Sequence, residues 1–259
     1  MFKDQIFLVT GGANGIGLAT ARALKKRGAK LALWDVDAVA LQTVSSELDA
    51  VTAVVDVTRS ETIQTGLQAL VEHYGRLDGV IHCAGIARGG LFEEVPLEQH
   101  RRVIEINLFG TIAVTQLVLP LLRRSKGSLV LISSVSAFYG PPGFSSYAAT
   151  KAGVLNFAQL MQVELTGSGV HIGVICPHFV DTALYQLESR KSALTKGSSP
   201  LLELRTPDQI AVSILRGIER RKFMIWAGWK ARLIYLMTRY LDFAGYRVML
   251  MTWRRAQKE

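Results

Sequence analysis

QIFLVTGGANGIG, residues 5–17, is the stretch of sequence that decides the fold. Its first half is an apolar run that predicts a buried strand, and a helical pattern follows as far as Arg27. The glycines between them permit positive φ and a close approach of the backbone, and the N-terminus of the helix attracts anions. This order predicts a phosphate site for a dinucleotide, with a purely structural turn as the alternative. The predicted contacts are Gly11, Asn14, Gly15, Ile16 and Gly17.

A carboxylate at the end of the second predicted strand, LALWDVD at 31–37, indicates which dinucleotide binds. Asp35 lies about 20 residues beyond the glycines, where a carboxylate can hold the adenosine ribose hydroxyls of NAD. It would repel the 2′-phosphate of NADP, and no Arg or Lys directly follows the strand. We therefore expect NAD rather than NADP. The alternative role, capping the next helix, is one that Asp37 can also fill.

Further strands and helices alternate along the chain. This alternation predicts a single Rossmann-type α/β domain over residues 1–228, with a doubly wound parallel sheet of about seven strands and helices on both faces. The remaining predicted strands are 50–57, 77–85, 127–134, 170–177 and 221–228. The predicted helices after the second strand are 59–74, a continuous 97–124, 146–166, and one that begins near Thr206 with Pro207 in its first turn.

SSVSAFYGPPGFSSYAATK, residues 133–151, contains a candidate catalytic group. Tyr147 and Lys151 are four residues apart and share one face of the predicted helix. A nearby ammonium group favours the phenolate, so we expect Lys151 to lower the pKa of Tyr147 and suit it to proton exchange with an alcohol or carbonyl oxygen. Ser134, at the end of a strand, can hydrogen-bond the same oxygen. A solvated helix face is the alternative interpretation of this spacing.

The basic charge of the chain is concentrated at its end. The net charge is +9, and residues 220–259, with ten Lys or Arg and two acids, carry +8 of it. Nucleic acid is therefore not an expected partner of the chain as a whole. The two cysteines, Cys83 and Cys176, lie in apolar runs and read as buried thiols of a reducing compartment. We expect no signal peptide, no ordinary transmembrane helix, no metal site and a cytoplasmic protein.

Taken together, these motifs resemble those of the short-chain dehydrogenase/reductase family over residues 4–228. TGGANGIG looks like the family's T-G-x-x-x-G-x-G, and Tyr147 and Lys151 match its Y-x-x-x-K at the usual distance from Ser134. The resemblance implies an NAD-dependent oxidoreductase whose catalytic residues are Asn107, Ser134, Tyr147 and Lys151. It further implies cofactor contacts from Asp56, Val57, Cys83, Ala84, Gly85, Tyr147, Lys151, Pro177, Val180 and Thr182.

Two positions depart from the family pattern. Cys83 stands where the family usually has Asn before Ala-Gly, so the centre of the sheet must be stabilised differently. His178 follows Pro177 where the family usually has Gly, and it is expected in the wall of the substrate pocket, with a proton relay as the alternative. The other expected pocket residues are Ser134, Phe138, Phe144 and Leu184, the last within a substrate lid at about 183–206.

The C-terminal extension, residues 229–259, has an apolar face flanked by basic residues. Trp229, Leu233, Leu236, Met237, Tyr240 and Ala244 share that face, and Lys230, Arg232 and Arg239 lie off it. This pattern favours either a helix in the interface of an anionic membrane or a helix packed on the body or across a subunit boundary. The family resemblance implies a homodimer or homotetramer.

Three functions agree with these observations. The first is interconversion of a secondary alcohol and a ketone on a lipophilic substrate such as a steroid, retinoid or lipid, with Tyr147 as general acid/base. The second is an NAD(P)H-dependent ketoreductase of 3-oxoacyl or ketosphinganine-type substrates. The third is a non-catalytic protein that senses the nucleotide, which the presence of all four catalytic residues disfavours.

Overall fold

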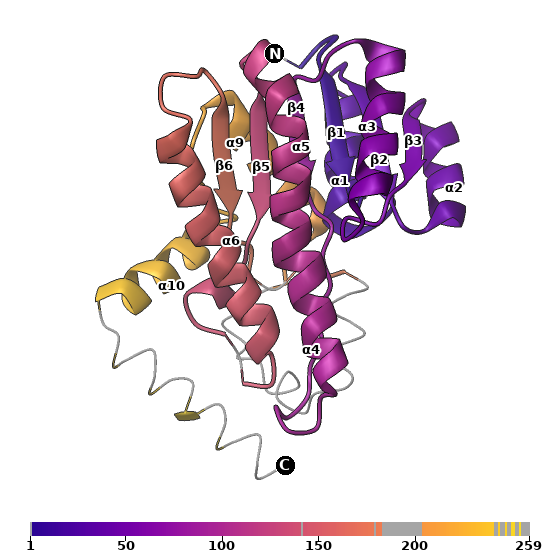
Figure 1. Cartoon of the computed structure of the whole chain (residues 1–259). Coiled ribbons are helices and arrows are strands. Elements are labelled where there is room, and N and C mark those ends of the chain that lie inside the picture. Colours follow the sequence, from indigo (N-terminus) through magenta and orange to yellow (C-terminus); the bar gives the residue numbers. More distant parts are fainter. Residues whose placement is uncertain are drawn as a thin grey trace.

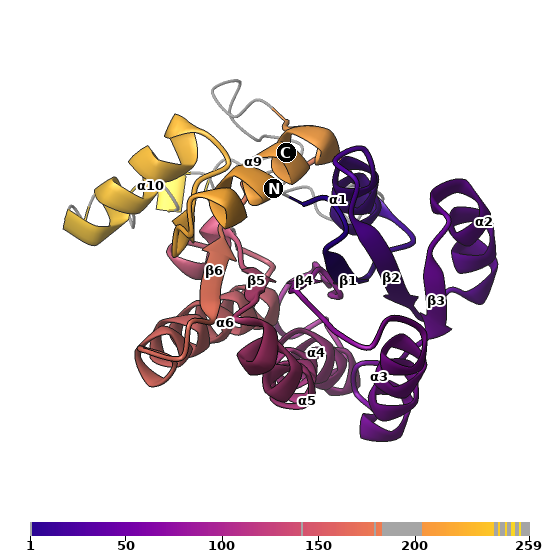
Figure 2. The same cartoon turned by 90° about the horizontal axis from the view of Figure 1, so that it is seen from above.

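The computed structural model describes residues 2–140, 142–178, 180–182 and 204–240, together with residues 243, 247, 250, 251 and 254. Within these residues the strands form one seven-stranded parallel sheet in the order β3-β2-β1-β4-β5-β6-β7 (Figure 1). Helices cover both of its faces (Figure 2). The predicted single-domain, doubly wound α/β fold is therefore confirmed.

The strands follow the sequence prediction closely in position and less closely in length. The strand predicted at 221–228 is only two residues long, because this edge strand pairs only at Val174↔Met224 and Ile175↔Ile225. The strand predicted at 50–57 ends at Val54, opposite the end of its partner at Asp35. The strands are β1 (Ile6–Thr10), β2 (Lys30–Asp35), β3 (Val51–Val54), β4 (Gly79–His82), β5 (Ser128–Ile132), β6 (His171–Ile175) and β7 (Met224–Ile225).

Alternate residues of the central strands supply two separate apolar cores. Val9 and Ile81 face the layer of α1 (Gly15–Lys25), α2 (Ala38–Leu48) and α9 (Pro207–Glu219). Leu8 and Val80 face the layer of α3 (Ser60–Tyr74), α5 (Gly110–Ser125) and α6 (Ser145–Glu164). Strands that are covered on both faces need apolar side chains at consecutive positions, which explains the uninterrupted runs in the sequence.

The helix predicted as continuous over 97–124 is interrupted, which corrects that prediction. It consists of α4 (Leu97–Ile104), a π-helical turn η1 (Glu105–Phe109) and α5. The widened turn is visible in the bond from the Gly110 N–H to the Glu105 carbonyl, five residues back. Asn107 lies inside the π turn, and the Thr111 hydroxyl donates to its carbonyl at 2.6 Å. The polar side chain of Asn107 thus sits where the helix changes its phase.

The run Leu97–Ser125 is long and apolar enough to cross a membrane by length and composition alone. In this fold it lies on the sheet, with Val114, Val118 and Leu122 buried in the core. Core helices pass the same test, so the run is weak evidence for a membrane span.

Two predicted helix starts have side-chain caps. The Asp37 carboxylate accepts from the Ala40 N–H at 2.9 Å and caps α2, so the capping role belongs to Asp37 rather than Asp35. Thr206 and Gln209 form a reciprocal capping box at the start of α9, where Pro207 occupies the first position. The predicted lid, 183–206, lies outside the described residues except for its last three positions.

Gly79 is required by the ring of Phe7, its partner on the neighbouring strand. A Cβ at residue 79 would lie 2.1 Å from Phe7 Cε1. We expect Gly79→Ala to lower the free energy of unfolding by about 1–3 kcal/mol, because the core would be overpacked. Adding Phe7→Leu should recover part of this loss in a double-mutant cycle measured by urea unfolding.

Gly75→Ala is the matched control, since a Cβ at residue 75 meets nothing within 4 Å and the cost arises from its φ of 72°. Phe7→Leu should add to that cost without rescue. Purely additive effects of Phe7→Leu and Gly79→Ala would contradict the proposed steric cause.

Candidate active site

The predicted catalytic residues meet at the carboxyl edge of the sheet. The strand order reverses between β1 and β4, and this edge is where doubly wound sheets have their crevice. Ser134 follows β5, Tyr147 and Lys151 lie on the first turns of α6, and Asn107 comes from the π turn. Four separate positions in the sequence thereby contribute to one site.

Lys151 is a buried ammonium group held by the end of β5. Its Nζ donates to the Ile132 carbonyl at 2.9 Å and lies 5.5 Å from the centre of the Tyr147 ring. The Ser133 hydroxyl donates to the Lys151 carbonyl at 2.8 Å, which ties α6 to β5 a second time. Burial lowers the pKa of Lys151 to about 8, although the nearby Cys83 and Cys176 act to raise it.

The pKa of Tyr147 moves in the direction opposite to the sequence expectation. Burial raises it, a hydrogen bond with Ser134 acts to lower it, and Cys176 adds to the rise. The expected lowering by Lys151 does not appear, because loss of hydration disfavours a phenolate at this partly buried position. Tyr147 therefore holds its proton in this state of the protein.

Ser134 is fixed by its own turn. Its backbone is extended, and its hydroxyl oxygen accepts from the Ser136 N–H at 3.1 Å at the start of the 3-10 turn η2 (Val135–Ala137). The hydroxyl also lies 3.5 Å from the Pro177 carbonyl. Since Ser134 also bonds with Tyr147, the two hydroxyls are neighbours and can reach one substrate oxygen together.

Asn107 joins the helix to the loop after β4. Its Oδ1 accepts from the Ile86 N–H at 2.8 Å and its Nδ2 donates to the Ile86 carbonyl at 2.8 Å. The same Nδ2 lies 3.2 Å from Thr150 Oγ1, next to Lys151 on α6. A Cβ on Gly85 would lie 3.1 Å from Asn107 Oδ1 and 3.6 Å from Lys151 Nζ, so Gly85 borders both side chains.

Thr10 and His82 stabilise the centre of the sheet, where Cys83 replaces the usual Asn. The Thr10 hydroxyl oxygen accepts from the Ala84 N–H at 3.2 Å and is hydrogen-bonded to His82 Nδ1 at 2.9 Å. The Cys83 N–H donates to the Thr10 carbonyl at 3.1 Å. Sequence reasoning missed His82, although an imidazole in the otherwise apolar run before Cys83 was a usable signal.

The glycine-rich turn forms a cradle that fits a phosphate. Gly11 and Gly15 have φ of 62° and 54°, and a Cβ on Gly17 would lie 2.0 Å from the Gly11 carbonyl oxygen. The first turn of α1 contains no acidic residue, and Asn14 makes no side-chain cap among the described residues. A Cβ on Gly15 would lie 3.5 Å from Thr182 Cγ2, which places Thr182 beside the turn. The N–H groups of α1 are thus offered to an anion.

Asp35 is oriented by backbone groups at the mouth of this cradle. Its Oδ2 accepts from the Ala13 N–H at 3.1 Å and its Oδ1 from the Val36 N–H at 2.8 Å. The carboxylate therefore lies between the glycine-rich turn and the end of β2, the position expected for a ribose-binding acid.

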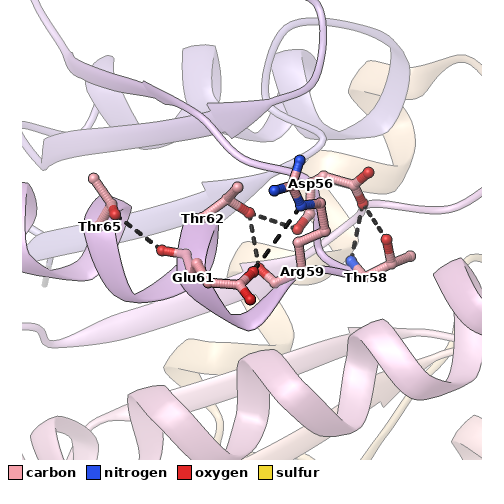
Figure 3. Close-up of polar contacts among 6 residues, drawn as sticks. All are labelled: Asp56, Thr58, Arg59, Glu61, Thr62 and Thr65. Atoms are coloured by element: carbon pink, nitrogen blue, oxygen red, sulfur yellow. Dashed lines mark hydrogen bonds and ion pairs between the residues drawn. The ribbon is translucent and has the colours of Figure 1, made fainter.

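Asp56 is held by the turn that follows it (Figure 3). Its Oδ1 accepts from the Thr58 N–H at 2.9 Å and the Thr58 hydroxyl at 2.7 Å, and its carbonyl accepts from Thr62. Burial acts to raise the pKa of Asp56, but these hydrogen bonds, with Arg102 and Arg59, outweigh it and lower the pKa. Asp56 is thus an ionised carboxylate in the turn between β3 and α3.

The other predicted residues fall into three groups. Val57 and Val180 are buried, and the partly buried Ile16 side chain packs against the core. Phe144 is buried, and the centre of its ring lies 6.5 Å from that of Tyr147. Phe138 and His178 are half-buried. Leu184 lies outside the described residues.

Comparison with known proteins identifies the family. The sequence profile of the short chain dehydrogenases matches residues 5–193. The chain belongs to this family. The chain is 33% identical to the 3-oxoacyl-[acyl-carrier-protein] reductase FabG of Thermotoga maritima over 222 residues, which are 82% of this chain and 89% of that protein.

Two solved structures of short-chain dehydrogenases share the fold. A short chain dehydrogenase/reductase from Burkholderia phymatum in complex with NAD matches with a TM-score of 0.82 at 21% identity, covering 94% of this chain and 96% of that one. A 3-ketoacyl-(acyl-carrier-protein) reductase from Brucella melitensis complexed with NADH matches at 0.80 and 19%, covering 88% and 99%. Short-chain dehydrogenases are oxidoreductases that bind a nicotinamide cofactor, and the cradle fits one.

His82 should make the stability of the protein depend on pH. Burial lowers its pKa from 6.5 to about 3, so the unfolded chain binds a proton over this range that the folded chain does not. Its contribution to stability is complete above the unfolded value and is lost as the pH falls, by up to about 1.4 kcal/mol per pH unit. His82→Gln should therefore show a shallower decrease in the free energy of unfolding between those pH values.

Thr10→Ser is the matched control, because it retains both the imidazole and the hydroxyl. Its slope against pH should equal that of the wild type. Equal slopes for His82→Gln and the wild type would contradict the buried neutral imidazole.

Proposed function

We propose that this protein is an NAD(P)H-dependent ketoreductase that reduces the 3-oxo group of an acyl chain to a secondary alcohol. The observation that carries the proposal is the pair Ser134 and Tyr147, two hydroxyl groups able to meet one carbonyl oxygen beside the buried Lys151. The 33% identity with a 3-oxoacyl-[acyl-carrier-protein] reductase over 89% of its length supports the substrate class. Of the functions compatible with the sequence, this ketoreductase is better supported than the steroid or retinoid dehydrogenase.

Tyr147 can supply the proton that reduction of a ketone requires. A ketone that is reduced needs a proton on its oxygen, and a phenol whose pKa is raised by burial carries that proton at neutral pH. Ser134 orients the carbonyl oxygen, and the charge of Lys151 stabilises the negative charge that develops there. Asn107 is a positioning residue, because its side chain bonds both the loop at Ile86 and Thr150 on α6, next to Lys151.

The nicotinamide cofactor would lie along the carboxyl edge of the sheet and supply the hydride. The α1 cradle would hold its phosphates, and Asp35 and Asp56 would face its adenosine end. Gly85 lies beside Lys151 and Thr182 lies beside the glycine-rich turn, so both would border the route of the cofactor, and Val180 is the third expected contact. We propose NADH rather than NADPH, because a backbone-held carboxylate at position 35 repels a 2′-phosphate.

A panel of substrates tests the proposed reaction. Purified protein with NADH should reduce 3-oxoacyl thioesters of different chain lengths, followed by the loss of NADH absorbance. Hydroxysteroids and retinols with NAD⁺ form the opposing arm. Oxidation of a steroid or retinol with no reduction of any thioester would support the alternative dehydrogenase, and no turnover in either arm would favour a nucleotide-sensing protein.

Tyr147→Phe should abolish reduction, because it removes the proton donor and little else. We expect a loss of at least about a hundredfold in kcat, in line with general acid catalysis, with the Kd for NADH nearly unchanged in a fluorescence titration. Tyr74→Phe is the matched control, since its hydroxyl bonds the Leu31 carbonyl at 3.1 Å, away from the site. Substantial activity in Tyr147→Phe would disprove the mechanism.

Asp35→Ser should shift the cofactor preference toward NADPH. The change removes the carboxylate that repels a 2′-phosphate, and the ratio of kcat/KM for NADPH over NADH should rise at least about tenfold, the equivalent of 1.4 kcal/mol. Asp37→Ser is the control, because that side chain caps α2 and faces Ala40. A preference for NADPH in the wild type would refute the assignment of Asp35.

The cytoplasmic location and the homodimer or homotetramer stay predictions. Exposed apolar side chains on the helices of one face provide a surface on which a second copy could pack. They are Ile112 on α5 and Leu160 and Val163 on α6. The molar mass from light scattering would determine the number of subunits.

A further inference from the structure

Helix α10 (Trp229–Tyr240) contacts the body of the protein through Ala231 and Tyr235. Ala231 is buried there, and the Tyr235 ring lies 4.8 Å from that of Phe138 and 5.3 Å from that of Trp226. Phe138 directly follows η2, the turn that begins after Ser134. The helix is therefore anchored beside the active site, at the carboxyl edge of the sheet (Figure 1).

The opposite side of α10 presents an apolar surface to solvent. We call it the α10 stripe, and it consists of Trp229, Leu233, Leu236, Met237 and Tyr240, all of which are exposed. Its two aromatic ends, Trp229 and Tyr240, are 68% and 77% exposed. Their spacing of three and four residues places them on one side of the helix. Packing on the body, one of the two roles expected from the sequence, thus leaves the predicted apolar face uncovered.

Exposed side chains of the same two kinds occur beyond α10. Phe243 and Met251 are exposed and apolar, and Arg247 and Arg254 are exposed and basic. Residues 229–259 contain seven Lys or Arg and two acids, a net charge of +5, so the other 228 residues carry +9 − 5 = +4. Apolar side chains interleaved with cations are typical of helices at anionic membrane surfaces.

We propose that the α10 stripe docks on a lipid bilayer that contains anionic lipids. Trp229, Leu233 and Met237 enter the boundary between headgroups and acyl chains, and Arg232 stays at the level of the headgroups. Because α10 is anchored at Phe138, docking brings the carboxyl edge of the sheet close to the bilayer. This inference does not depend on the identity of the substrate.

Co-sedimentation of the full-length protein with vesicles tests the proposal. The protein should bind vesicles that contain phosphatidylglycerol more tightly than vesicles of phosphatidylcholine alone, and added salt should weaken binding. Leu233→Gln with Met237→Gln should lower the partition coefficient at least about tenfold, because apolar area no longer leaves water. Arg232→Gln should lower it about fivefold on anionic vesicles only.

Val39→Gln is the control, because Val39 is an exposed apolar residue that lies on α2, toward the opposite edge of the sheet. It should bind vesicles like the wild type, and all variants should keep their Tm and their reduction of a soluble ketone with NADH. Absence of vesicle binding by the wild type, or binding unaffected by the double substitution, would overturn the proposal. If the double substitution instead halves the molar mass in solution and the wild type ignores vesicles, the stripe is a subunit interface.

Discussion

A buried ammonium group, that of Lys151, sets the conditions for the rest of the site. Only 6% of this residue is exposed, and a charge in such a position is tolerated only when it is hydrogen-bonded. The Ile132 carbonyl at the end of β5 meets this need, and Ser133 binds the backbone of the same lysine. Helix α6 therefore has to start against the end of β5, and Tyr147, one turn earlier, is carried to the same place.

The same loss of hydration acts on Tyr147 and Lys151 of α6 and moves their pKa values in opposite directions. It lowers the pKa of Lys151 to about 8 and raises that of Tyr147, so each group is pushed toward its neutral form. Near neutral pH the phenol is protonated and the ammonium still largely charged. Together with Ser134, the site then offers hydrogen-bond donors and positive charge to one oxygen, an arrangement suited to a carbonyl that gains electron density.

Much of this could be predicted from the sequence, because it rests on local patterns. Glycines at fixed spacing, apolar runs and the pair Tyr147 and Lys151 predicted the sheet, the cradle and the position of the site. The predictions that were wrong or incomplete concern properties set by tertiary packing. The direction of the Tyr147 pKa follows from how far packing removes the hydroxyl from water, and β7 stops at Ile225 because its partner strand ends opposite it at Ile175. The role of His82 could not be predicted, because its hydrogen-bond partner Thr10 lies on the neighbouring strand, 72 residues away in the sequence.

The π turn at Glu105–Phe109 imposes a constraint on chain length. It joins α4 and α5 out of phase, and each residue of an ordinary helix turns the chain by about 100°. Removing one residue from this turn would restore a regular helix and rotate the Asn107 amide away from Ile86 and Thr150, although every catalytic residue type would still be encoded. In an alignment with related chains, a single gap at this turn would mark a protein that has lost the hydrogen bonds of the Asn107 amide to Ile86 and Thr150. Substitutions of the other four residues of the turn would leave these bonds in place, so at this point of the fold the number of residues matters more than the identity of any residue except Asn107.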